Sequence, residues 1–102
     1  MKLKHFMTSN LAILRDDIIE SIPSTTFDSH EFIRYFAKKF EIKYVEFLSF
    51  YDNEPFRNVH AQIGKFLSEN QDSLKIKDGG VIHSPNIFGI DSQNEKWIKI
   101  DK

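Results

Sequence analysis

Hydrophobic positions recur at helical spacing over the first 70 residues, and they predict four helices there. The first helix covers residues 11–22, where one face collects Leu11, Leu14, Ile18 and Ile22. Pro23 ends this helix, because the residue before a proline avoids the helical region. The adjoining segments are less regular: residues 24–27 fit a short strand or an extended linker, and residues 1–8 fit a flexible N-terminus.

A capping box predicts where the second helix begins. Asp28 and Glu31 stand three residues apart, as the N-cap and N3 positions of such a box require. The hydrophobic face that follows consists of Phe32, Ile33, Phe36 and Phe40. We therefore expect a helix from Asp28 to about Phe40.

Two further helices follow over residues 41–51 and 55–70. The first is so rich in aromatic side chains that it must be central or part of an interface. The second has Pro55 in its first turn, where no backbone donor is needed, and Asp52 or Asn53 as a possible cap. Its predicted core face is Phe56, Val59, Ile63, Phe66 and Leu67.

After residue 70 the period changes from helical to alternating. Residues 74–77 predict a strand, residues 78–80 a glycine turn, and residues 81–83 the return strand. Residues 84–89 fit an ordered loop, residues 91–95 a turn, and residues 96–100 a final strand.

These elements predict one α+β domain over residues 1–102, with four helices followed by a C-terminal β-hairpin or small antiparallel sheet. The order is winged-helix-like, because a recognition helix would stand directly before the hairpin. The match is partial, since the helix over residues 41–51 is additional.

Composition and charge limit the possible functions. The chain has no cysteine, which excludes disulfides, thiolate metal sites and a cysteine nucleophile. No hydrophobic run reaches the length of a signal peptide or a membrane span, so we expect a cytoplasmic protein. The net charge is −1, from fourteen Lys and Arg against fifteen Asp and Glu, so any nucleic-acid surface must be a local patch.

The outer face of the helix over residues 55–70 carries side chains suited to DNA. Arg can pair with guanine, Asn and Gln can pair with adenine, and Lys can contact phosphate. The candidates on this helix are Arg57, Asn58, Gln62 and Lys65. The alternative is that they only cover the solvated face of an amphipathic helix.

The predicted hairpin carries lysines that suit phosphate contacts. They are Lys75, Lys77 and Lys99, with Lys96 beside them. Alternating lysine equally fits the protection of an exposed strand edge against aggregation. Asp78 and Glu95 dilute the positive charge of this patch.

Aromatic residues support a different function, a protein interface. Phe47, Phe50, Tyr51 and Trp97 together exceed what one small core is expected to hide, and such residues are enriched at interfaces. The alternative is a core that is unusually rich in phenylalanine.

Nothing in the sequence argues for an enzyme, a cofactor or a metal. The four histidines are separated by 23 or more residues and form no local ligand pair. Asp16 and Asp17 are adjacent on a helix and point about 100° apart, so they do not converge on one substrate.

Three segments followed by Trp97 resemble a family of short, functionally uncharacterised bacterial proteins. The segments are FDSHEFI (27–33), PFRNVHAQIGKFL (55–67) and SPNIFG (84–89). The resemblance covers most of residues 22–97 and implies a complete small domain that is winged-helix-like. It implies no catalytic residue and no ligand.

We therefore expect a DNA-binding homodimer, for example a transcriptional regulator. It would contact duplex DNA through residues 55–70 and the lysine-bearing hairpin. The alternative is an interaction or oligomerisation domain that uses residues 44–51 and binds no DNA.

Overall fold

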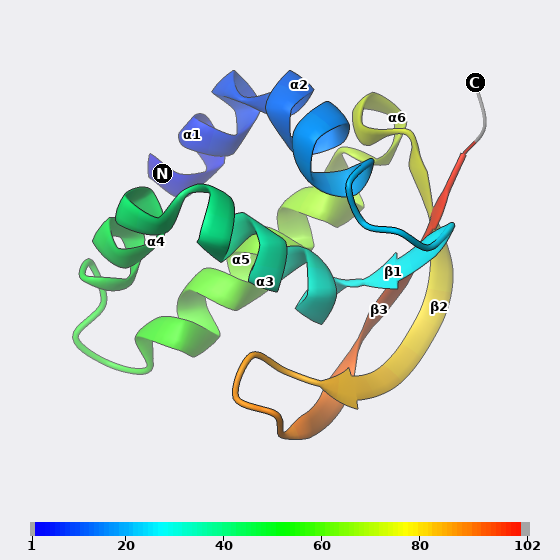
Figure 1. Cartoon of the computed structure of the whole chain (residues 1–102). Helices are drawn as coiled ribbons and strands as arrows, with labels where there is room; N and C mark the ends of the chain where they lie inside the picture. The colour runs from blue at the N-terminus through cyan, green and yellow to red at the C-terminus, as the bar shows by residue number, and fades with distance from the viewer. Residues whose placement is uncertain (1, 101–102) are drawn as a thin grey trace.

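Helices lie on one side of the molecule and a small sheet on the other (Figure 1). The computed structural model describes residues 2–100. Within them the chain is mixed α+β, as predicted. The helices are α1 (Lys2–Ser9), α2 (Leu11–Ile13), a π-helical segment (Leu14–Ile19), α3 (Ser29–Lys39), α4 (Glu41–Leu48), α5 (Pro55–Glu69) and α6 (Gln71–Leu74). The strands are β1 (Thr26–Asp28), β2 (Ile76–Pro85) and β3 (Asp91–Lys99).

The sheet is antiparallel, with β3 between β1 and β2. β1 stands between two helical stretches in the chain, while β2 and β3 form the hairpin. Trp97 of β3 lies opposite Phe27 of β1 and is 1% exposed. Its indole Nε1 donates a hydrogen bond to Ser29 Oγ at 3.0 Å, so the sheet and the start of α3 are tied together within the core.

The N-terminal segment is part of the fold. Residues 2–8 belong to α1, and Leu3 and Met7, one helical turn apart, are 1% and 0% exposed. This corrects the expectation of a flexible N-terminus over residues 1–8, of which residue 1 lies outside the described residues. The short hydrophobic pattern became a helix because α5 provides the surface that buries it.

The helix predicted over residues 11–22 ends earlier than expected, at Ile19, and most of it has the wider turns of a π-helix. After α2 the chain forms π-helical turns, in which the Glu20 N–H donates to the carbonyl of Arg15, five residues earlier, at 3.1 Å. The predicted core positions Leu14, Ile18 and Ile22 are buried, and the wider turn buries Ile19 as well.

The capping box of α3 is confirmed. The Glu31 N–H donates to Asp28 Oδ1 at 2.9 Å, and the Asp28 N–H donates to Glu31 Oε1 at 3.2 Å. These two bonds fix the point at which β1 becomes helix. The predicted core residues Phe32, Ile33 and Phe36 are all buried, while Phe40 is partly buried against the core.

The inner face of α5 is confirmed except at its first turn. Val59, Ile63, Phe66 and Leu67 are buried, but Phe56 is 38% exposed. Phe56 is not a core residue because the start of α5 extends beyond the core. Its ring instead packs edge-on against Phe88 of the hairpin loop, with the ring centroids 4.9 Å apart.

Neither Asp52 nor Asn53 caps α5. The N-cap is Glu54, in the left-handed region with φ of 46° and without a side-chain capping bond. The Asn58 amide holds this turn by donating to the carbonyls of Asn53 and Glu54 at 3.0 and 3.1 Å. Pro55 does occupy the first turn, as predicted.

The hairpin turn lies later in the chain than the sequence indicated. β2 continues through Gly79 and Gly80 with a shift of register between Asp78 and Val81, so these glycines form a bulge and not a turn. The turn covers residues 86–90, where Asn86 Oδ1 accepts from the N–H groups of Phe88 and Ile90 at 2.9 and 3.1 Å. Residues 91–95, predicted as a turn, belong to β3.

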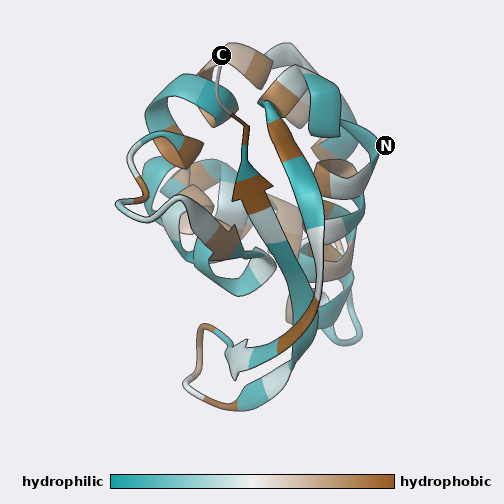
Figure 2. Cartoon of the chain, turned by 90° about the vertical axis from the view of Figure 1, so that its right-hand side faces the viewer, coloured by the Kyte–Doolittle hydropathy of each residue, from teal (hydrophilic) through white to brown (hydrophobic). Residues whose placement is uncertain are grey.

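The outcome is a long, curved hairpin (Figure 2). Phe88 and Ile90 in its turn and Val81 in the middle of β2 are each more than half exposed. The predicted four helices followed by a hairpin thus become six α-helices and one π-helical segment within residues 2–100, with a three-stranded sheet.

Candidate functional site

The four candidate residues of α5 lie on its outer side, but their side chains differ in availability. Arg57 is the most accessible, with 80% of its side chain exposed and Nη1 3.5 Å from Glu54 Oε1. Lys65 is also exposed. Asn58 bonds to the turn before the helix, and the Gln62 amide donates to the Tyr51 hydroxyl. Arg57 and Lys65 are therefore the side chains that can reach a ligand without breaking a helix-anchoring contact.

The candidate lysines of the hairpin stand at its base. Lys75 ends α6 with φ of 58°, and Lys77 follows the buried Ile76, so alternation directs Lys77 to the opposite face of the sheet. The Lys99 ammonium group donates to the carbonyl of Ile22. The structure therefore turns Lys77 away from the helices and engages the ammonium group of Lys99, while Lys75 is exposed.

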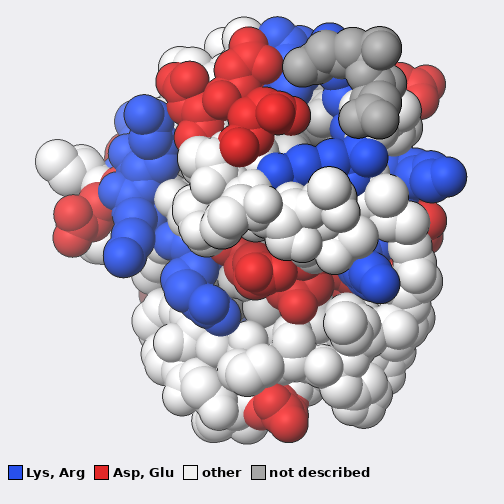
Figure 3. Space-filling model, turned by 45° about the vertical axis from the view of Figure 1, so that its right-hand side comes forward, with Lys and Arg blue, Asp and Glu red and all other residues white. Residues whose placement is uncertain are grey.

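Carboxylates border the groove between α5 and the hairpin. Asp78 and Glu95 line this groove together with Lys65. A hydrogen bond between the two carboxyl groups raises the pKa of Glu95 and lowers the pKa of Asp78. On the face shown in Figure 3, positive and negative groups are intermixed from the top to just below the middle, and only the lowest part is almost without charge.

A polar network that sequence reasoning missed joins the hairpin to the start of α3. The His30 N–H donates to Asn94 Oδ1 at 3.0 Å, and His30 Nδ1 lies 3.1 Å from the carbonyl of Ser84. Ser92 Oγ lies 3.3 Å from His30 Nε2. Polar residues at alternate positions 92 and 94 of one strand were the signal that could have indicated this contact.

A second histidine joins α5 to α4. Tyr44 Oη lies 2.6 Å from His60 Nε2, and the two rings stack with centroids 5.9 Å apart. Burial lowers the pKa of His60 to about 4, with a smaller effect from His30. Burial also raises the pKa of Tyr44 to about 12. Both groups are therefore uncharged at neutral pH.

The partly buried His60 leads us to expect that the protein loses stability in mild acid. Between pH 6.5 and about pH 4 the unfolded chain protonates His60 and the folded chain does not, so the unfolded state binds more protons. The free energy of unfolding should fall as the pH is lowered through this window. Urea unfolding at several pH values, followed by circular dichroism, measures it.

The matched control for this prediction is His83→Gln, because His83 is exposed on β2. In this variant the free energy of unfolding should depend on pH as in the wild type. In His60→Gln it should change less with pH between pH 6.5 and about pH 4. Equal slopes in the wild type and His60→Gln would contradict the prediction.

The aromatic residues considered for an interface divide into two groups. Phe47 and Trp97 are 4% and 1% exposed and belong to the core, as a phenylalanine-rich core implies. Phe50 is 46% exposed, and Tyr51 is partly buried. The most exposed hydrophobic residues of this region are aliphatic: Ile42 at 84% and Val45 at 58%.

Within residues 2–100, no three His, Asp or Glu side chains gather in a way that could hold a metal ion. None of the helices in this range has the length and hydrophobicity needed to cross a membrane. The chain matches no protein-family model, no curated protein and no solved structure.

Proposed function

We propose that this chain is a winged-helix-like domain that binds duplex DNA through α5. The observation that carries the proposal is the order of the elements. β1 stands between helical segments and pairs with β3, β2 pairs with the other edge of β3, and α5 precedes the hairpin with only α6 between them. A winged-helix domain has a closely related order, to which α4 and α6 are additional here, and its helix before the hairpin enters the major groove.

The accessible side chains of α5 suggest how DNA would be contacted. Arg57 is placed near the N-terminus of the helix, where recognition helices touch base edges, and its guanidinium group suits guanine. Lys65, two turns later, would contact phosphate. Gln62 can reach a base only by giving up its hydrogen bond to the Tyr51 hydroxyl.

The remaining candidates would have supporting roles. Asn58 holds the turn that sets the direction of α5. Lys75 and Lys77, both exposed, can add phosphate contacts at the base of the hairpin, while Lys99 needs its ammonium group for the carbonyl of Ile22. With few cations and nearby carboxylates, we expect modest affinity, and the small number of phosphate contacts limits how steeply the affinity falls with salt.

A fluorescence anisotropy titration of labelled random duplex DNA at low salt tests this proposal. We expect a dissociation constant of about 10⁻⁴ M or lower, which rises as salt is added because counterions are released on binding. Absence of binding at about 100 µM protein would overturn the proposal, since non-specific affinities of DNA-binding domains reach this range.

A further inference from the structure

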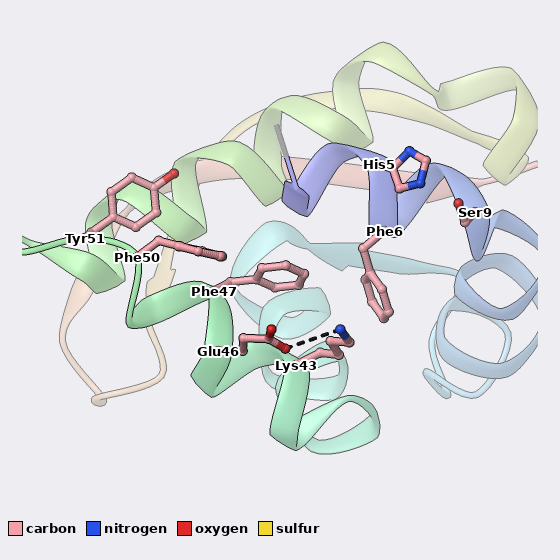
Figure 4. Close-up of a pocket in the computed structure, with 8 residues that line it drawn as sticks. All are labelled: His5, Phe6, Ser9, Lys43, Glu46, Phe47, Phe50 and Tyr51. Atoms are coloured by element: carbon pink, nitrogen blue, oxygen red, sulfur yellow. Dashed lines mark ion pairs between the residues drawn. The ribbon is translucent and has the colours of Figure 1, made fainter.

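A groove with a hydrophobic floor lies between α1 and α4 (Figure 4). Its volume is about 1030 Å³. Phe6 of α1 and Phe47 of α4 pack together at this floor, with ring centroids 5.5 Å apart, and Phe50 adds a half-exposed ring. The groove is therefore a concave apolar surface, framed by polar side chains from both helices.

Helix α4, which forms one side of this groove, also carries a protruding hydrophobic side chain, Ile42. Ile42 is 84% exposed and lies one helical turn before Glu46, which lines the groove, so the two share a face of α4. A self-complementary surface of this kind, with a projection and a depression side by side, is what a twofold interface requires. Each copy can then fill the depression of the other.

The charges on the rim also favour a second copy. Lys43 and Glu46 stand one helical turn apart, with Lys43 Nζ 3.3 Å from Glu46 Oε1. A strongly acidic or strongly basic partner would meet a like charge on this rim. A second α4 in antiparallel orientation would instead place each Lys43 beside the partner's Glu46, so opposite charges meet on both sides of the axis.

We propose that a second copy of this chain closes the groove, with the two α4 helices antiparallel and Ile42 of each copy seated in the groove of the other. The eight residues of α4 extend only about 12 Å. A standard interface buries roughly 800 Å² per partner, so the α1 side of the groove must share the contact. We expect a dissociation constant on the order of 10 µM.

Sedimentation equilibrium from about 1 to 500 µM protein, without DNA, tests this dimer, because the range spans the expected dissociation constant. The wild type should double its mass across the range. Ile42→Glu should raise the dissociation constant at least about tenfold, since it places a charge in an apolar groove. The matched control is Val81→Glu, because Val81 is 60% exposed on β2 and should leave the constant unchanged.

A charge-exchange pair tests the orientation and does not depend on Ile42. Lys43→Glu should weaken the dimer, because each new carboxylate meets the partner's Glu46. Adding Glu46→Lys should restore it, since opposite charges again meet across the axis. Circular dichroism checks that each variant keeps its helices.

The proposal is overturned if the wild type stays monomeric at 500 µM, or if Ile42→Glu and Val81→Glu have the same effect. A monomer whose groove still binds an amphipathic test peptide would also overturn it, because the occupant would then be another protein. The dimer does not rest on DNA binding: a monomer that binds DNA refutes the dimer alone, and a dimer that binds no DNA refutes the proposed function alone.

Discussion

Replacing Trp97 with alanine should lower the free energy of unfolding by about 3–5 kcal/mol, the usual cost of removing a buried aromatic ring. Trp97 is 1% exposed and lies at the centre of the sheet, opposite Phe27 on one side and Asp78 on the other. The substitution empties the space between the sheet and α3. It also removes the indole partner of Ser29, which is itself buried.

Urea unfolding followed by far-ultraviolet circular dichroism measures this loss, since Trp97 is the only tryptophan available for fluorescence. Trp97→Phe should cost less than alanine because the ring still fills most of the space. The control Val81→Ala, at a residue that is 60% exposed, should change the free energy by less than about 0.5 kcal/mol. A loss below about 1 kcal/mol for Trp97→Ala would contradict the described core.

Replacing Arg57 with alanine should weaken DNA binding by about 1–3 kcal/mol, or roughly 5- to 150-fold. The side chain is 80% exposed, so the fold should not change. Its ion pair with Glu54 is also exposed and adds little to stability. The loss would therefore report on DNA contact and not on folding.

Two further variants, also measured by fluorescence anisotropy, test the DNA contacts of α5. Glu54→Gln should strengthen binding, because it removes a carboxylate that competes with DNA for Arg57. Lys65→Ala should weaken binding to all DNA sequences, as expected for a phosphate contact. It should also make the slope of log K against log[salt] shallower by about one. The control is Lys38→Ala on α3. If Arg57→Ala binds like the wild type, α5 is not the recognition helix.

Local sequence signals predicted the parts of the fold that depend on neighbouring residues. The capping box of Asp28 and Glu31 was confirmed because both of its bonds form within four residues of chain. The inner face of α5 was confirmed from Val59 to Leu67 because helical periodicity alone decides which side chains share a face.

The hairpin shows why such signals can also mislead. Asp78, Gly79 and Gly80 have the composition of a turn, but the pairing of β2 with β3 continues across them as a bulge. The turn formed where the Asn86 side chain could accept two backbone N–H groups and Gly89 could adopt a positive φ of 80°. Which candidate turn is used depends on strand register, which distant residues set.

The positions of the candidate site residues depend on tertiary structure even more than the hairpin turn does. The sequence indicated which polar residues lie outside the core face of α5, but it could not tell which way the hairpin lysines point. Alternation along β2 turns Lys77 away from the helices, and the ammonium group of Lys99 is held by Ile22. Their positions follow from the packing of the sheet, so periodicity could not give them.

The sequence by itself thus determined the α+β class, the core faces of α3 and α5 and the start of α3, since each rests on interactions within one or two turns of chain. Only the tertiary structure decided that residues 2–9 are helical, that Phe56 leaves the core for Phe88, and that His30 joins the hairpin. Each of these depends on a surface supplied by a segment far away in the sequence.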